Sequence, residues 1–439
     1  MRKFYLAFLC FSLLAGVFMS CSDDDKYIPT LPQVSIESLS GEFAMPQEDS
    51  IVLRAKIASP LATTLSWSIK GNEVSKDSVF TFKMNELGKY EVKLTATNTD
   101  GEVSATASIE VYGKYKYGTF VLNERSTLVF ISPKGIVSDS VYYKVNGTTL
   151  GRSSQDLFIS NNKMYIISQN SGTDGYLVVT NAETMKKEAD YKEALEDYVS
   201  GPTHVAVLGD DDIYLRDGRG INLFHPSTGG FLLIEGTEGA RKNTMAVVEG
   251  KVFATVGNAV VVMEKGKNKI TKSIEFDSRV SGVIKSSDGN LWVSTESGKI
   301  SKVNAKDYSI TKTNELPQDA ASTLDCGYAA APSITAKGDT LYMSGLKTKI
   351  YRHIFSTNQT KLMVDAADMV ENANMVYNTV AVHPITGEVY LNTIKGYTPD
   401  YLINHISVFN FSGTEPKLSA NYENYTKYPA GTFFTYNFE

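Results

Sequence analysis

The side chains of this sequence that could do chemistry follow no catalytic motif. Its histidines have no metal-ligand spacing such as His-x-His or i, i+4, and they are His204, His225, His353, His383 and His405. The sequence also contains no Gly-x-Ser-x-Gly elbow, phosphate-binding loop or dinucleotide fingerprint. We therefore expect no catalytic residue, no metal and no cofactor, and we predict that the protein is not an enzyme.

Three acidic patterns leave alternatives open. Asp210-Asp211-Asp212 offers carboxylates for calcium, but it falls where the chain requires a turn. Residues 286–292 are similar to a sialidase Asp-box, although the spacing differs and the pattern occurs once. Carboxylates from separate repeats could meet as a general acid and base, which spacing alone does not test. A glycan lyase or hydrolase is therefore a less favoured alternative.

A different set of polar and aromatic side chains falls between predicted strands, in loops that commonly carry function. We predict that they bind a ligand. Eight lie in connections between one four-stranded unit and the next, namely Arg152, Gln155, His204, Arg241, Lys242, Arg279, Tyr328 and Tyr377. Four lie in connections between the second and third strands of a unit, namely Gln169, Asn170, Tyr397 and Tyr401. The connection at 394–405 is the longest of its kind, so its two tyrosines could fold over a ligand.

The elements that must position these side chains are clearest at residues 279–313. Short apolar runs at 280–284, 290–294, 299–304 and 309–313 are separated by Gly, Asp, Asn and Ser. Alternating apolar and polar residues between tight reversals are typical of half-buried strands. Four such strands form one antiparallel meander, which is the size of a propeller blade.

This unit repeats along the chain. In each repeat, an aromatic residue follows an apolar or small residue shortly after a turn. Successive aromatics lie 39 to 50 residues apart, and they are Tyr165, Tyr214, Phe253, Trp292, Tyr342 and Tyr390. Aromatic residues at such regular spacing are expected in the cores of blades. In a propeller, the two kinds of connection named above open on one face around the central channel, where ligands bind.

The six aromatic repeats leave both ends of the repeat region to be explained. Residues 119–123, 128–132 and 136–143 predict three strands of a further blade that lacks an innermost strand, and residues 431–436 predict one unpaired strand. Pairing the two ends would remove an exposed edge. We therefore predict a seven-bladed β-propeller at 117–439, closed by the C-terminal strand. Residues 183–198 are polar and rich in helix formers, and predict a short surface helix.

The N-terminus predicts export. Arg2 and Lys3 precede an apolar stretch at 4–19, which is short for a membrane span. Ser20-Cys21 resembles a bacterial lipoprotein cleavage site, which implies a lipidated Cys21. The following Ser22-Asp23-Asp24-Asp25 resembles the export tag of Bacteroidetes surface lipoproteins. The alternative is a simple secretory signal at 1–21 and a solvated charge run. We expect an outer-membrane protein that is lipid-anchored and faces the cell exterior.

Composition narrows the classes of protein further. The apolar content of 42% and the charged content of 21% are those of a globular protein. The net charge of -6 gives no basic footprint, so no nucleic-acid partner is expected. Removal of Cys10 with the signal and lipidation of Cys21 would leave only Cys326, which excludes a disulfide framework.

A small all-β domain is predicted at 33–113, after a tether at 22–32. In residues 88–98 the apolar side chains Tyr90, Val92, Leu94 and Ala96 alternate onto one face, as in a sandwich strand. Trp67 lies in a second predicted strand and is expected in the core. The run from Gly88 to Asn98 resembles the closing strands of a PKD-type, immunoglobulin-like domain. The predicted fold is all-β, a small sandwich followed by the propeller.

The repeat region also resembles a known family. Residues 120–124, 150–156, 289–293 and 382–390 resemble Bacteroidetes propeller lipoproteins of the YncE-like, DUF5074 type. That family includes surface proteins that capture cobalamin and pass it to a TonB-dependent outer-membrane transporter. The sequence has Thr203 where the family tends to have Arg, and it has an additional N-terminal domain.

The resemblance implies a non-enzymatic surface protein that captures cobalamin or another corrinoid. A carbohydrate-binding or adhesive module is the alternative, in which Tyr377, Tyr397 and Tyr401 stack on sugar rings. A scaffold that docks another surface protein is a further alternative.

Overall fold

The computed structural model describes residues 27–325 and 332–436, with the Thr379 side chain left aside. The chain divides into two compact units. Unit 1 consists of Met1–Met45 and Asp49–Val111, and unit 2 of Pro46–Glu48 and Tyr112–Glu439. The predicted lipidation site, Cys21, lies outside the described residues. Among those residues, no helix is long and apolar enough to cross a bilayer.

Unit 1 contains two antiparallel sheets. The larger has the order β2 (Ala44–Pro46), β8 (Gly101–Tyr112), β7 (Gly88–Asn98), β4 (Thr64–Ile69), β5 (Asn72–Ser75), and the smaller has the order β1 (Gln33–Ser38), β3 (Ile51–Ala58), β6 (Val79–Phe82). The alternation predicted for β7 is confirmed, since Tyr90, Val92, Leu94 and Ala96 are buried. Trp67 is fully buried as predicted, and its Nε1 donates to the Asp77 carbonyl oxygen at 2.8 Å.

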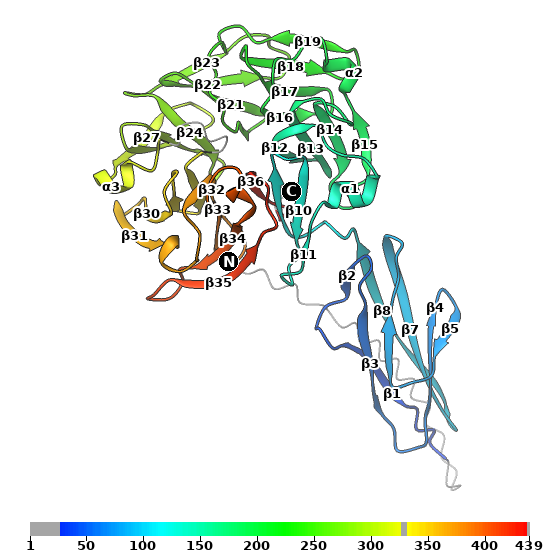
Figure 1. The fold of residues 1–439 in the computed structure, drawn as a ribbon. Coiled ribbons are helices and arrows are strands. Elements are labelled where there is room, and N and C mark those ends of the chain that lie inside the picture. The colour runs from blue at the N-terminus through cyan, green and yellow to red at the C-terminus, as the bar shows by residue number, and fades with distance from the viewer. Residues whose placement is uncertain (1–26, 326–331, 437–439) are drawn as a thin grey trace. The chain divides into compact units, whose positions relative to one another are not determined.

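Unit 2 contains repeated four-stranded antiparallel sheets (Figure 1). The first to third run β36 (Pro429–Phe434), β9 (Thr119–Asn123), β10 (Thr127–Ile131), β11 (Val137–Ser138); β12 (Arg152–Ser160), β13 (Lys163–Asn170), β14 (Leu177–Asn181), β15 (Lys187–Asp190); and β16 (His204–Gly209), β17 (Asp212–Arg216), β18 (Ile221–His225), β19 (Gly230–Leu233). The fourth and fifth run β20 (Ala246–Val248), β21 (Lys251–Val256), β22 (Ala259–Glu264), β23 (Lys272–Glu275); and β24 (Val280–Lys285), β25 (Leu291–Thr295), β26 (Lys299–Val303), β27 (Ile310–Glu315). The last two run β28 (Ile334–Lys337), β29 (Thr340–Met343), β30 (Lys349–Ile354), β31 (Gln359–Asp365); and β32 (Met375–Val382), β33 (Val389–Ile394), β34 (Asn404–Asn410), β35 (Lys417–Glu423).

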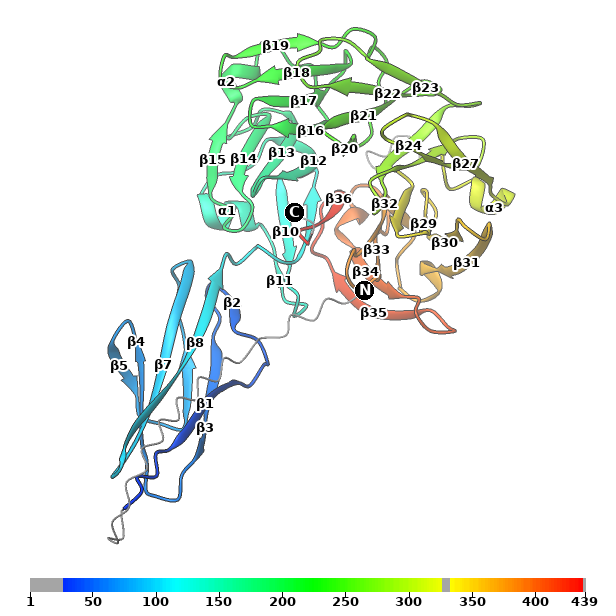
Figure 2. The same cartoon turned by 180° about the vertical axis from the view of Figure 1, so that it is seen from behind.

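The first strands of successive sheets contact one another, which makes the arrangement propeller-like. These contacts join β12 to β16, β16 to β20, β20 to β24, β24 to β28, β28 to β32, β32 to β36, and β36 to β12. Figure 2 shows the sheets of unit 2 from behind, following one another in chain order. The pairing predicted for the C-terminal strand is present, because β36 lies antiparallel to β9 with Thr432 opposite Val121.

The regularly spaced aromatic residues lie in the second strand of their sheets, and their predicted burial in the cores is confirmed. All are buried, and they are Tyr165, Tyr214, Phe253, Trp292, Tyr342 and Tyr390. The four strands predicted at 279–313 correspond to β24 to β27. Burial of one large ring per sheet gives each blade-like unit its own apolar centre.

Helices are few and short: α1 (Val141–Asn146), α2 (Lys192–Leu195), α3 (Gln318–Ala321), and the 3-10 turns η1 (Ala366–Asp368) and η2 (Asp400–Leu402). The strand predicted at 136–143 is wrong beyond β11. Val141 and Tyr142 are adjacent and both fully buried, which a strand with one buried face does not permit but α1 does. The helix predicted at 183–198 is reduced to α2, since Lys187–Asp190 pairs with β14 instead.

Removal of β36 tests how far unit 2 depends on its C-terminal strand. We expect a chain that ends at Tyr428 to lose at least about 4 kcal/mol of unfolding free energy, because β9 becomes an open edge and buried Ala430 is removed. Thermal and urea unfolding measure this loss. A chain that ends at Tyr436 is the control and should unfold like the full chain. Equal stability of the two truncations would contradict the prediction.

Candidate functional site

A cleft of about 720 Å³ lies where loops of the first, second and last sheets meet. Its lining is Glu124, Arg125, Ser126, Arg152, Ser153, Asn170, Tyr377, Tyr397 and Tyr428. An adjoining hollow of about 620 Å³ shares Ser126, Arg152 and Asn170 with it. Pockets of this size that combine rings with a few polar groups are typical ligand sites.

Tyr428 is the centre of an aromatic cluster in this cleft. Its ring stacks on Tyr401, with centroids 4.3 Å apart and planes 12° apart. The Tyr377 centroid lies 5.1 Å from Tyr428, and the Tyr397 centroid lies 6.5 Å from it. Tyr428 is 8% exposed, whereas Tyr397 is 63% exposed. The cluster therefore has a fixed ring at its base and an accessible ring at its rim.

Hydrogen bonds from two other loops fix Tyr428. Its carbonyl oxygen accepts from the Glu124 amide at 2.8 Å, which joins it to the loop between β9 and β10. Its hydroxyl lies 3.1 Å from the Thr398 amide and 3.0 Å from Thr398 Oγ1, in the loop between β33 and β34. Its φ of 58° lies in the left-handed region, where a bulky residue is strained unless its surroundings hold it.

Three buried asparagines position the same loops. Asn404 Nδ2 donates to the carbonyl oxygens of Tyr401 and Thr426 at 3.0 and 2.9 Å, and its Oδ1 accepts from the Thr426 amide at 2.9 Å. Asn123 Oδ1 accepts from the Lys427 amide at 2.9 Å. Asn378 Nδ2 donates to the Pro429 carbonyl oxygen at 2.9 Å. These side-chain bonds satisfy backbone groups of irregular loops that the β-ladders do not reach.

Close backbone approach positions the Arg152 side of the cleft. Ser126 Oγ donates to the Gly151 carbonyl oxygen at 2.7 Å, which joins the loop after β9 to the start of β12. A Cβ at Gly151 would lie 2.3 Å from the Gly175 carbonyl oxygen, so only glycine fits there. Arg152 follows directly and is exposed toward the cleft.

The charges of the cleft are two arginines and one carboxylate. The Tyr377 hydroxyl donates to Glu124 Oε2 at 3.2 Å, and burial together with this carboxylate raises the pKa of Tyr377. The Arg125 guanidinium carbon lies 5.8 Å from the Tyr401 centroid and 5.7 Å from the Tyr428 centroid, a cation–π arrangement. The site therefore offers rings, guanidinium donors and one carboxylate acceptor.

The structure brings five of the sequence-predicted binding residues together. Arg152, Asn170, Tyr377 and Tyr397 line the cleft, and Tyr401 packs behind it on Tyr428. Tyr328 lies outside the described residues. The other predicted residues lie elsewhere among these loops and strands.

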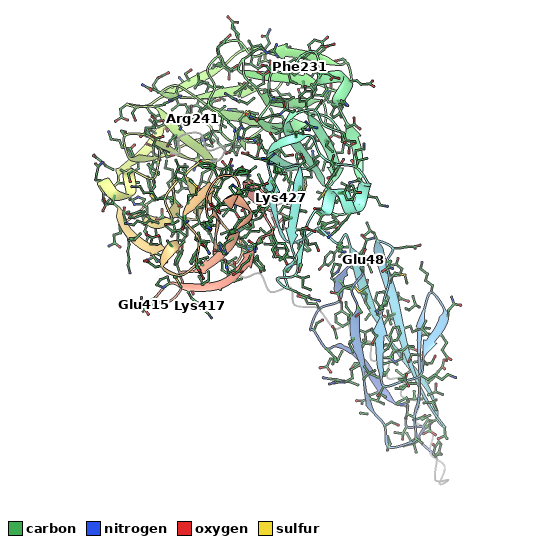
Figure 3. The ribbon with its side chains drawn as sticks, in the orientation of Figure 1. Glu48, Phe231, Arg241, Glu415, Lys417 and Lys427 are labelled. Atoms are coloured by element: carbon green, nitrogen blue, oxygen red, sulfur yellow. The ribbon has the colours of Figure 1, made fainter. Side chains whose placement is uncertain are left out.

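Those other residues have structural surroundings of their own. Arg241 Nη1 binds Glu296 Oε1 at 2.5 Å, and Arg279 Nε lies 4.0 Å from the same oxygen. Arg241 and Lys427, the neighbour of Tyr428, lie well apart in Figure 3. His204 is fully buried, with Nδ1 2.9 Å from Thr203 Oγ1. Gln169 is half-buried in β13 and does not line the cleft.

Lys242 is half-buried, and burial lowers its pKa while the charge of Glu124 opposes that shift. Among the described residues, this charge interaction connects Lys242 with the cleft.

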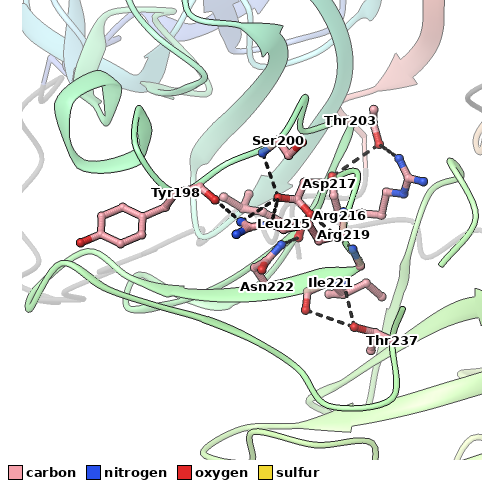
Figure 4. Close-up of polar contacts among 11 residues, drawn as sticks. Tyr198, Ser200, Thr203, Leu215, Arg216, Asp217, Arg219, Ile221, Asn222 and Thr237 are labelled. Carbon is pink, nitrogen blue, oxygen red and sulfur yellow. Dashed lines mark hydrogen bonds and ion pairs between the residues drawn. The ribbon is translucent and has the colours of Figure 1, made fainter. Parts of the chain in front are cut away.

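The loop between β17 and β18 is organised by a buried carboxylate (Figure 4). Asp217 is fully buried and accepts from the amides of Ser200 and Arg219 at 3.0 and 2.9 Å. The neighbouring Arg216 donates to the Ala240 carbonyl oxygen at 2.9 Å and to Thr203 Oγ1 at 3.3 Å. Both charges are used to hold loops, so this region is built as scaffold.

A second hollow of about 280 Å³ lies among the first strands and includes Gln155, Asp156, Thr244 and Asn378 in its lining. Asp156 accepts from the amides of Leu157 and Val205 at 2.9 and 3.1 Å, yet its burial raises its pKa to about 7. Gln155 Oε1 is buried and has no hydrogen-bond partner among the described residues. Within the described ranges, no three His, Cys, Asp or Glu side chains form a metal-ligand group.

Sequence reasoning missed Glu124, Arg125, Ser126, Ser153 and Tyr428. Tyr428 precedes the predicted C-terminal strand, and residues 124–126 join two predicted strands of the incomplete first blade. Once β36 is counted as the first strand of the first sheet, both segments are connections of the two kinds that carry the other predicted residues.

Comparison with known families gives two matches. The domain of unknown function DUF5074 matches residues 117–435, and the PKD domain matches residues 39–111. The chain belongs to the DUF5074 family. Comparison with curated proteins gives no match.

Solved structures add a likeness of fold to this family assignment. A quinonprotein alcohol dehydrogenase-like protein from Bacteroides thetaiotaomicron aligns with a TM-score of 0.55 and 16% identity, over 91% of this chain and 99% of that chain. The Neurospora crassa Pan2 WD40 domain aligns with a TM-score of 0.41 and 11% identity, over 68% of this chain and 85% of that chain. The first likeness supports a propeller-like fold.

Asn404→Ala tests the support of the aromatic loop in this DUF5074 chain. It removes the donors for Tyr401 and Thr426 and leaves buried backbone groups unpaired. We expect a loss of about 2–3 kcal/mol of unfolding free energy, measured by urea denaturation. Asn258→Ala, at an exposed loop position, is the control and should change stability by less than about 0.5 kcal/mol. A loss no larger than that of the control would contradict this role of Asn404.

Asp156→Asn tests the raised pKa of the buried carboxyl. Asp156 has a higher pKa in the folded state than the ordinary 3.8, so its stabilising contribution is lost as pH rises through about 7. Between pH 5 and pH 8 the natural chain should therefore lose about 2–3 kcal/mol relative to the variant. Urea unfolding of both chains across this range measures the difference. Parallel pH profiles would contradict the assignment.

Proposed function

We propose that this protein is a non-enzymatic, lipid-anchored surface protein that captures a small molecule, with a corrinoid as its leading ligand. It would pass that ligand to a TonB-dependent outer-membrane transporter. The observation that carries the proposal is the cleft in which the accessible Tyr397 ring, the fixed Tyr428 ring and two arginines come together. Rings cover an apolar ligand face, and the polar side chains select its orientation.

Capture fits this cleft better than catalysis does. Glycoside hydrolysis ordinarily requires a pair of carboxyl groups that flank the scissile bond. Among the described residues that line the cleft, Glu124 is the single carboxylate, and it accepts the Tyr377 hydroxyl. A residue already paired in this way is suited to positioning Tyr377.

A closed ring of seven blades is part of the same proposal. It is supported by seven four-stranded sheets within the described residues and by contacts that return from β32 through β36 to β12. In this arrangement β36 is the innermost strand of the first blade, and closure removes two sheet edges. The loops that carry Tyr397, Tyr428 and Arg125 would then share one face of a rigid scaffold.

The location at the cell surface rests on the sequence. The charged start, the apolar stretch and Ser20-Cys21 support export and lipidation, and the acidic residues that follow support surface display. The PKD domain at 39–111 would serve as a spacer between the lipid and the ligand-binding unit.

Carbohydrate binding is the second candidate function. The specific observation in its favour is the 63% exposure of Tyr397 beside Arg152, Asn170 and Glu124. An exposed ring with hydrogen-bonding groups around it can stack on one face of a sugar and bind its hydroxyls.

Co-elution with cyanocobalamin tests the proposal. The mature chain without lipid is mixed with the ligand and passed through a sizing column, where visible absorbance reports the ligand. We expect stoichiometric co-elution. We expect Tyr397→Ala with Tyr401→Ala to weaken binding about tenfold, because the change removes the Tyr397 ring contact, worth about 1 kcal/mol, and the Tyr401 ring on which Tyr428 stacks. Tyr198→Ala, a half-exposed ring outside the cleft, is the control. Free ligand at micromolar protein would overturn tight corrinoid capture and direct the search to glycan arrays.

A further inference from the structure

We propose that the cleft selects ligands that carry an acidic group, and that Arg125 and Arg152 bind that group. This inference rests on the proposed capture function and names the chemistry that the site recognises. The phosphate group of a corrinoid and the carboxylate of an acidic saccharide both fit this description, because both present charged oxygens to a guanidinium.

The partners of the arginines single out these two residues. Six of the eight arginines in the described ranges have an oxygen partner. Arg54 lies 3.7 Å from Glu37, Arg216 binds the Ala240 carbonyl oxygen, Arg219 binds Asp217, Arg241 and Arg279 share Glu296, and Arg352 contacts the Tyr342 hydroxyl. Arg125 and Arg152 have neither an ion pair nor a side-chain hydrogen bond to any described residue, and both line the same cleft.

The surroundings of Arg125 orient it without occupying its donors. Its contacts are with the faces or edges of the Tyr401 and Tyr428 rings, at 5.8 and 5.7 Å from their centroids. A ring contact restricts the orientation of the guanidinium plane. It provides no oxygen acceptor for the five N–H groups. The donors remain available for a ligand, and a planar fork matches a carboxylate or a phosphate with two parallel bonds.

The balance of charge within the cleft also favours an anion. The lining of the cleft contains two guanidinium groups and one carboxylate. That carboxylate already accepts a hydrogen bond from the Tyr377 hydroxyl. The Lys242 ammonium adds a further positive charge that acts on Glu124. The chain as a whole carries a net charge of -6, so this positive cleft is a local feature and not a consequence of composition.

Ligand pairs that differ mainly in the acidic group test the inference. The first pair is dicyanocobinamide phosphate and dicyanocobinamide, which lacks only the phosphate group. The second is an oligogalacturonate and its fully methyl-esterified form. Each is titrated by calorimetry into the mature chain at low and at physiological salt. In the pair that contains the ligand class of this protein, we expect the acidic member to bind at least about tenfold more tightly than the neutral member. We expect added salt to weaken that binding.

Variants connect the preference to the two arginines. Arg125→Gln and Arg152→Gln should each weaken binding of the acidic ligand about tenfold and leave the neutral ligand within about twofold. Arg279→Gln is the matched control, because Arg279 is exposed but lies beside Glu296 and outside the cleft. Thermal unfolding verifies that each variant folds.

The outcomes separate the two proposals. Equal binding of the acidic and neutral members, or unchanged affinity in both arginine variants, would overturn the anion preference and leave capture intact. Failure of all four ligands to bind would overturn capture of both ligand classes, and the anion preference with it. Loss of affinity in Arg279→Gln as large as in Arg125→Gln would place the anion elsewhere and overturn this assignment.

Discussion

The antiparallel ladder between β36 and β9 is the interaction on which the candidate site depends. It places Pro429 opposite Asn123, so Tyr428 stands directly before a strand whose position is fixed by main-chain bonds. The same register brings the Tyr428 carbonyl oxygen to the Glu124 amide and the Lys427 amide to Asn123 Oδ1. A strand from the C-terminus and a strand that begins more than 300 residues earlier therefore define the base of the cleft together.

Around this ladder, polar bonds are used for position and rings for contact. Three buried asparagine side chains hydrogen-bond to loop backbone, namely Asn123, Asn378 and Asn404. The side chains that line the cleft include Arg125, Arg152 and Tyr397. Buried, satisfied amides hold irregular loops rigidly, since each unpaired group would be costly. A rigid base with an accessible rim suits a protein that binds a ligand without changing it.

Periodicity made the strands predictable. The site was harder to predict, because it depends on how sheets that are distant in the sequence lie in space. The buried aromatics from Tyr165 to Tyr390 recur at a regular spacing, so the sheets could be located without coordinates. The cleft instead depends on the contact between Tyr428 and Glu124, which lie near opposite ends of the repeat region. No sequence spacing predicts that contact. Arg241 and Arg279 have the residue type and loop position of ligand-binding groups, yet they meet Glu296, a pairing that sequence does not reveal. The helix predicted within 183–198 is confined to α2, because Lys187–Asp190 pairs with the edge of β14.

Hydrogen–deuterium exchange with and without cyanocobalamin shows whether the loops around Tyr428 form the binding site. We expect slower exchange in peptides that cover 123–126, 395–403 and 424–428, where the amides of Glu124, Thr398 and Lys427 bind their partners. We also expect little change at 257–258 and 296–298, loops outside the cleft. Stoichiometric binding that slows exchange elsewhere, and leaves these three loops unchanged, would contradict this location of the binding site.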